Sequence, residues 1–137
     1  MERVFVDTDI CLDLLSGRKP FNSFAEQLFS LADKKEIEIC VSALSFSTID
    51  YILHAQYAVK NPRQLIAKFK TLVTTLSVES RTIDLAIASD FDDFEDAIQY
   101  NTAIENEITV LITRNIKDYK AAQIKVITSE SYLVKNL

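Results

Sequence analysis

The chain has 137 residues, a formal net charge of −5 and a hydrophobic fraction of 48%. This length suits one domain that buries about two-thirds of its unfolded surface, so the sequence predicts a single domain over residues 1–137. The acidic balance excludes nucleic-acid binding by a broad surface of clustered Lys and Arg. One glycine in the whole chain excludes glycine-rich nucleotide-binding loops.

The N-terminus, the hydrophobicity pattern and the cysteines bear on the location of the protein. Glu2, Arg3 and Asp7 interrupt the N-terminus where a secretory signal needs a continuous apolar region, and no stretch is apolar enough to cross a membrane. Cys11 and Cys40 lie in apolar runs without the spacing of a zinc site, which indicates reduced core cysteines. We therefore expect a cytoplasmic protein without a membrane partner.

Short apolar runs alternate with helical spacing along the chain. The predicted strands cover residues 4–6, 37–41, 76–78, 108–112 and 126–127. The predicted helices cover residues 10–15, 21–32, 43–57, 65–73 and 83–88, a segment from the acidic stretch 90–96 to residue 104, and a last helix from residue 129. Ser42 and Ser129 are expected to cap two of these helices, and Asp92 with Glu95 has the spacing of a capping box.

Strands that are separated by helices require crossover connections, which predicts a mostly parallel central sheet in a three-layer α/β/α fold. In such sheets, ligands bind beyond the carboxyl ends of the strands. The chemistry should therefore be sought at that edge of the sheet.

Polar side chains from three separate segments are expected to meet at this edge. They are Asp7 and Asp9 after the first strand, Asp93, Glu95 and Asp96 at a helix start, and Thr113 and Asn115 after the fourth strand. Neighbouring carboxylates repel one another unless a cation neutralises them, and hard oxygen ligands favour Mg²⁺ or Mn²⁺. Such an ion polarises phosphoryl oxygens and lowers the pKa of a bound water, which is the chemistry of a nuclease. A structural network that merely collects acids is an equal alternative.

Other residues have weaker assignments. Arg114 follows the fourth strand and either binds a substrate phosphate or is a solvated surface arginine. His54, the only histidine, is expected in a surface or packing role. The aromatic residues expected in the core rather than as base-stacking platforms are Phe5, Phe21, Phe24, Phe29 and Phe69.

With these residues in view, the chain resembles the PIN-domain family, in particular the branch with an Asp-Phe-Glu-Asp stretch, and the VapC-like toxin nucleases. The blocks that carry the resemblance are Val4-Phe5-Val6-Asp7-Thr8-Asp9, Val41-Ser42-Ala43-Leu44, Asp93-Phe94-Glu95-Asp96-Ala97-Ile98-Gln99-Tyr100 and Ile112-Thr113-Arg114-Asn115. Their order and spacing span almost the whole chain.

The resemblance implies a PIN-like fold and a Mg²⁺- or Mn²⁺-dependent endoribonuclease, commonly the toxin of a toxin–antitoxin pair, with RNA as substrate, a cognate antitoxin as partner and a homodimer as assembly. Asp7 and Asp96 match metal-binding acids, with Thr113 close to the metal and Asn115 at the fourth position. Thr48 stands where the family usually has a Glu, and the nearest acid is Asp50. Asn115 replaces a frequent Asp, although Asp118 follows it, and Asp9 stands where Asn is common.

Two other functions stay open. Asp7-Thr8-Asp9 after an apolar strand also resembles the nucleophile motif of haloacid-dehalogenase-type phosphatases, in which Asp7 would form an aspartyl phosphate, although Cys11 stands where that family prefers Thr. The missing Glu and the presence of Asn115 motivate a PIN-like binding module with weakened or lost catalysis.

Overall fold

The central sheet is built from five parallel strands in the order β3-β2-β1-β4-β5. The computed structural model describes residues 1–135, so the end of the predicted 1–137 domain lies outside the described residues. The strands are β1 (Glu2–Val6), β2 (Ile37–Ser42), β3 (Thr74–Leu76), β4 (Val110–Ile112) and β5 (Lys125–Ile127). The helices are α1 (Thr8–Ser16), α2 (Asn22–Asp33), α3 (Ala43–Tyr57), α4 (Pro62–Lys70), α5 (Ser80–Ile87), α6 (Phe94–Glu105), the 3₁₀ turn η1 (Ile116–Tyr119) and α7 (Ser129–Lys135).

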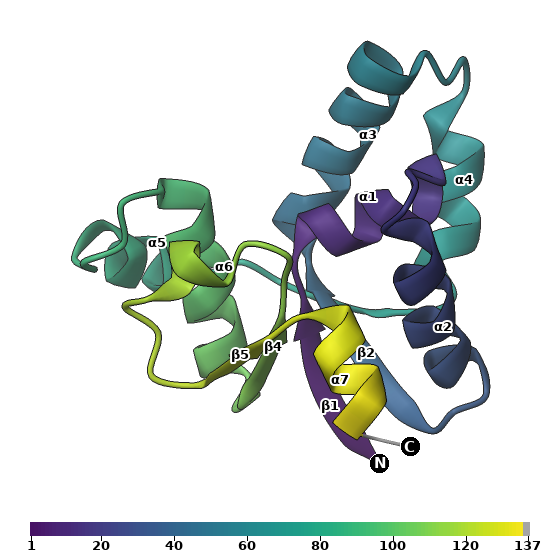
Figure 1. Cartoon of the computed structure of the whole chain (residues 1–137). Coiled ribbons are helices and arrows are strands. Elements are labelled where there is room, and N and C mark those ends of the chain that lie inside the picture. Colours follow the sequence, from purple (N-terminus) through teal and green to yellow (C-terminus); the bar gives the residue numbers. More distant parts are fainter. Residues whose placement is uncertain (136–137) are drawn as a thin grey trace.

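Alternate residues of the strands face two separate cores, which gives the molecule its three layers. Val4 and Val6 of β1 pack under α1 to α4 and α7, whereas Phe5 between them packs with residues of α6 and η1 on the opposite face. Both faces are covered at the centre of the sheet, so residues 4–6 of β1 and all of β4 are buried apolar runs, as in other parallel sheets. Figure 1 shows α5 and α6 on one side of the sheet and α1 to α4 on the other. The predicted α/β/α fold with a parallel sheet is confirmed.

Several helix ends differ from the prediction. Ser42 caps α3 as expected, with its Oγ accepting from the Ser45 N–H at 3.3 Å. Asp93, and not Asp92, caps α6, because its Oδ1 accepts from the Asp96 N–H at 2.9 Å. Ser129 was expected to cap α7 but is its first residue. The Thr128 hydroxyl accepts from the Ser131 N–H instead. Helix α4 starts earlier than predicted, at Pro62, where the missing N–H of proline costs nothing.

The expected burial holds for most of the aromatic residues. Phe5, Phe29 and Phe69 are buried, but Phe24 is only half-buried and Phe21 is 37% exposed. The prediction of Phe21 as a core residue is therefore wrong, because it precedes α2 on the rim of a pocket and not under the sheet. Across residues 1–135, no helix has the length and apolar character needed to span a bilayer.

Candidate functional site

The carboxyl ends of β1 and β4 are neighbours, which brings Asp7 beside Thr113. Val6 pairs with Ile112 in the sheet register, and the Asp7 N–H donates to the Ile112 carbonyl at 3.0 Å. The Thr113 hydroxyl lies 2.9 Å from Asp7 Oδ2. The strand order reverses between β1 and β4, and in open α/β sheets such a switch point is where ligands bind.

Asp7 and Asp9 lie at the start of α1. Asp7 is the N-cap, and its Oδ1 accepts from the Thr8 N–H at 2.8 Å, so the helix end favours its negative charge. Asp9 Oδ2 accepts from the Arg114 N–H at 3.1 Å and from the Asn115 Nδ2 at 3.2 Å. Asp9 Oδ1 is buried without a hydrogen-bond partner among the described residues. One carboxylate oxygen is thus left without a compensating donor.

Tyr119 joins Asp96 to this group. Its hydroxyl lies 3.0 Å from Asp7 Oδ2 and 3.4 Å from Asp96 Oδ1. A phenol has one proton and can donate it to only one carboxylate at a time. The Thr113 hydroxyl is shared in the same way, at 2.9 Å from Asp7 Oδ2 and 3.2 Å from Asp9 Oδ2. The structure therefore brings the three acids together with too few donors for all of them.

Burial is the main cause of raised pKa values among these acids. Burial, with the negative charge of Asp9 next in importance, raises the pKa of Asp7 from 3.8 to about 7. Burial, followed by the charges of Asp93 and Asp118, raises the pKa of Asp96 to about 7. Burial also raises the pKa of Asp9. Near neutral pH this cluster binds either protons or a cation.

Tyr119 stays protonated in this environment. Burial, reinforced by the negative charges of Asp7 and Asp96, raises the pKa of its phenol far above the ordinary value. Its role is therefore to donate a hydrogen bond and to hold the two carboxylates in place. Sequence reasoning missed this residue because it lies in a 3₁₀ turn without a periodic pattern.

The other predicted ligands lie around this centre. Asp93 uses Oδ1 to cap α6 and lines a cleft of about 250 Å³ together with Asp96 and Asp118. Asn115 is exposed and reaches Asp9 through its amide. The structure thus places Asp93 and Asn115 on two sides of the cluster of three acids, in contact with its members.

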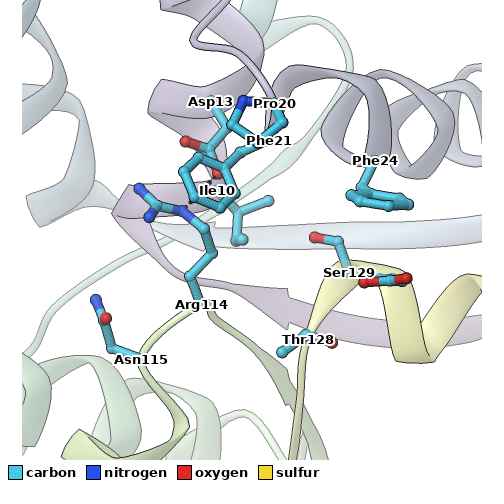
Figure 2. A pocket seen from close by; sticks show the side chains of 10 residues that line it. Ile10, Asp13, Pro20, Phe21, Phe24, Arg114, Asn115, Thr128 and Ser129 are labelled. Atoms are coloured by element: carbon cyan, nitrogen blue, oxygen red, sulfur yellow. Dashed lines mark hydrogen bonds and ion pairs between the residues drawn. The ribbon is translucent and has the colours of Figure 1, made fainter.

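Arg114 connects the acids to a neighbouring pocket. Its guanidinium Nε donates to Asp13 Oδ2 at 2.8 Å, and its Cζ lies 4.2 Å from the centre of the Phe21 ring. Asp13 is 1% exposed, and Arg18 lies 3.5 Å from its other oxygen. Figure 2 shows the Arg114 side chain extending toward Asp13 beside Phe21. Arg114 is therefore not a solvated surface arginine.

A buried network of hydrogen bonds connects the segments that carry the acids. Gln99 is fully buried, and its Nε2 donates to the Thr8 hydroxyl at 3.1 Å and to the Ser45 hydroxyl at 2.9 Å. Its Oε1 accepts from the Ser42 hydroxyl at 2.6 Å. The network fixes α1, α3 and α6 relative to one another. The sequence indicates this residue as a polar side chain on the apolar face of a predicted helix. A polar side chain that is buried there must be hydrogen-bonded, because burial without a partner costs free energy.

The acid that the resemblance places on α3 is absent, but a carboxylate lies next to that position. The Thr48 hydroxyl donates to Glu95 Oε1 at 3.4 Å, and burial raises the pKa of Glu95. His54 is exposed on the same helix and has no part in the acid cluster.

The oxygen-rich cluster fits a partly hydrated hard cation. Across residues 1–135, no three acid, His or Cys side chains form a complete ligand set. Mg²⁺ does not need such a set, because it keeps several waters and uses one or two carboxylates. Asp7 and Asp96 supply two, and the unpaired Asp9 Oδ1 lies in the same cluster. The donor set therefore suits Mg²⁺ or Mn²⁺ and not a soft metal.

The fold is that of a PIN domain. The PIN-domain family profile matches residues 3–117, and the chain belongs to that family. No curated protein sequence matches the chain.

Solved structures support the same fold. The sarcin–ricin-loop-cleaving toxin VapC20 of Mycobacterium tuberculosis has 15% identity and a TM-score of 0.68, with 89% of this chain and 98% of that chain covered. DNA-bound VapBC of Salmonella typhimurium has 14% identity and a TM-score of 0.71, with 94% and 99% covered. A toxin–antitoxin complex of Klebsiella pneumoniae has 21% identity and a TM-score of 0.67, with 92% and 97% covered.

Proposed function

We propose that this protein is a divalent-metal-dependent endoribonuclease and the toxin of a toxin–antitoxin pair. The observation that carries the proposal is the shared hydroxyl of Tyr119, which lies within hydrogen-bond range of both Asp7 and Asp96. Membership in the PIN-domain family supports nuclease chemistry at this site. RNA is the proposed substrate because VapC20, a structural neighbour, is described as cleaving the sarcin–ricin loop.

Asp7 and Asp96 are the proposed ligands of Mg²⁺ or Mn²⁺, with Asp9, Asp93 and Asn115 as the remaining oxygen donors around the ion. When bound, the ion supplies positive charge that polarises a phosphoryl oxygen of the scissile phosphodiester. That charge also offsets the repulsion between an anionic backbone and an acidic pocket.

Other residues of the chain position the proposed metal ligands through hydrogen bonds. Thr113 holds Asp7 through a contact of 2.9 Å, and Tyr119 holds Asp7 against Asp96. Hydrogen bonds to the ligand oxygens orient them, and such outer contacts typically contribute about 10- to 100-fold in metal affinity or activity. Arg114 Nε is paired with Asp13 at 2.8 Å, so only its remaining guanidinium N–H groups are proposed to contact the substrate phosphate.

The test is cleavage of a structured RNA that contains a sarcin–ricin loop, by purified protein with Mn²⁺ or Mg²⁺. We expect cleavage that stops in EDTA and in Asp7→Asn and Asp96→Asn. Asp84→Asn, at an exposed position of α5, is the matched control and should cleave like the wild type. Cleavage that survives in Asp7→Asn and Asp96→Asn would reject the assignment of these ligands.

The proposal includes a cognate antitoxin, a homodimer and a cytoplasmic location. Its support is that two of the similar structures are a VapBC assembly and a toxin–antitoxin complex. Co-expression with the product of an adjacent small reading frame should give a complex that does not cleave RNA. Light scattering of the purified chain measures its oligomeric state.

The same preparation tests the alternatives. An aspartate-based phosphomonoesterase would form a fluoroberyllate adduct on Asp7, which we do not expect from a metal-ligating Asp7. A binding module without catalysis would not cleave the RNA, either with Mn²⁺ or with Mg²⁺. Robust turnover in Mn²⁺ excludes that alternative.

A further inference from the structure

A pocket of about 490 Å³ opens beside the acid cluster and shares Arg114 and Asn115 with the proposed site. Its volume lies within the range of roughly 300–1,000 Å³ that is typical of small-molecule sites. Its lining residues come from α1, the start of α2, the loop after β4 and the start of α7: Ile10, Asp13, Pro20, Phe21, Phe24, Arg114, Asn115, Thr128, Ser129 and Glu130.

Two aromatic side chains in the lining offer stacking surfaces to a flat, uncharged ring. Figure 2 shows Phe21 and Phe24 on two sides, with Ile10 and the Ser129 hydroxyl between them in the view. Phe21 is 37% exposed, so part of its ring surface is free to contact a ligand. Aromatic side chains of this kind bind nucleobases by stacking, without strong dependence on base identity.

The charges in the pocket favour a base over a phosphate. Asp13 accepts from Arg114 Nε at 2.8 Å, so the nearest cation already has a counter-ion. Glu130 adds a further carboxylate at the rim. Among the side chains that line the pocket, Asp13 and Glu130 are negative and Arg114 alone is positive, and Arg18 behind them is also paired with Asp13. A phosphate inside the pocket is therefore disfavoured, whereas an uncharged ring is not.

One polar group inside the pocket has no partner. Ser129 is 5% exposed, and its Oγ has no hydrogen-bond partner within residues 1–135. Figure 2 shows this hydroxyl pointing into the pocket. A buried hydroxyl without a partner costs free energy, and a ligand with a donor or acceptor on its edge removes that cost. Every nucleobase has such an edge.

The pocket is joined to the acid cluster through adjacent residues. Asn115 lines the pocket and donates to Asp9 Oδ2, and the backbone N–H of Arg114 donates to the same oxygen. A nucleotide whose phosphate lies at the acids therefore has its neighbouring base within reach of the pocket. We propose that this pocket binds a nucleobase of the RNA next to the cleaved phosphodiester, an inference that rests on the proposed ribonuclease function.

The first test uses the four ribonucleosides, which lack phosphate, with the metal-free wild-type protein in EDTA. We expect NMR shifts at the backbone amides of Phe21, Arg114 and Ser129, and Phe21→Leu should weaken binding by about tenfold. Tyr51→Leu, a highly exposed aromatic position on α3, is the matched control and should bind like the wild type.

The second test is cleavage, with Mn²⁺, of oligoribonucleotides that differ in the base beside the cut. Phe21→Leu should raise KM with little change in kcat, and Ser129→Ala should alter the preference among bases by about threefold. The base pocket is rejected if nucleosides cause no NMR shifts and both variants keep the wild-type KM and base preference. If RNA is still cleaved in that case, the nuclease proposal stands. Occupation of the pocket by a peptide segment of a partner protein, with no nucleoside shift, would also reject it. Nucleoside binding without any RNA cleavage would support the pocket and reject the nuclease.

Discussion

Gln99 donates its side-chain amide to the Thr8 hydroxyl at 3.1 Å, and neither atom is accessible to solvent. Thr8 follows Asp7 directly, and Gln99 lies one helical turn after Asp96. The bond therefore ties together the two segments that position the proposed metal ligands.

Gln99→Leu should destabilise the fold, because it leaves the hydroxyls of Thr8, Ser45 and Ser42 without their amide partner. The expected loss is about 1–3 kcal/mol for buried polar groups left unpaired. Urea denaturation measures it as a lower midpoint at constant m-value. Gln64→Leu, at an exposed position of α4, should stay within about 0.5 kcal/mol of the wild type. Equal midpoints for the two variants would contradict the role of the network.

The stability of the metal-free protein should fall as pH rises from about 4 to about 7. The pKa of Asp7 rises from 3.8 to about 7 on folding, so between these values the folded state binds more protons than the unfolded state. Stability is lost with rising pH wherever the folded state holds the extra proton. Asp96 contributes with the same sign.

Thermal unfolding in EDTA at about pH 5 and about pH 8 measures this effect. The wild type should lose more stability between the two pH values than Asp7→Asn, which has no proton to release at that position. An identical pH dependence in the two proteins would show that Asp7 ionises normally in the fold.

Mn²⁺ should raise the Tm of the wild type at about pH 8, because the ion supplies the charge that the carboxylates lack. At about 100 times its Kd, a ligand that binds only the folded state adds about 2.7 kcal/mol. Asp96→Asn should lose most of this increase, and Asp84→Asn should keep it. A Tm increase of the same size in Asp96→Asn would place the ion elsewhere.

Tyr119→Phe should weaken Mn²⁺ binding by about tenfold, as loss of an outer hydrogen bond to a metal ligand typically does. Calorimetric titration measures the change in Kd. Tyr100→Phe is a matched control, because both rings pack against Phe91, with ring centres 5.1 Å apart for Tyr100 and 5.8 Å for Tyr119. An unchanged Kd in Tyr119→Phe would show that the phenol has only a packing role.

The main features of the sheet edge could be predicted from the sequence because they follow from strand ends. Asp7 follows a buried apolar run and Thr113 follows another, so a parallel sheet places them side by side. Asp96 was expected at this edge as part of an acid-rich helix start. The family resemblance then singled it out as a metal ligand, because such a helix start is also explained by capping. The capping residue itself was misplaced by one position, from Asp93 to Asp92, since both have the right side chain.

What could not be predicted depends on contacts between segments far apart in the chain. Ile108 looked like the start of a strand, but its N–H bonds to the Ala103 carbonyl and the strand begins at Val110. Strand β3 begins at Thr74, two residues before the predicted start, because a short edge strand has little apolar pattern. Pairing of Tyr119 with the acids depends on tertiary geometry that no local pattern encodes.

Both outer strands of the sheet, Thr74–Leu76 and Lys125–Ile127, are only 3 residues long. Short edge strands, one of them beginning with a lysine, are poor templates for hydrogen bonding to another chain. Self-association by extension of the sheet across a molecular boundary is therefore disfavoured, as is edge-to-edge aggregation at high expression. A functional dimer is therefore expected to form through other surfaces than the two sheet edges.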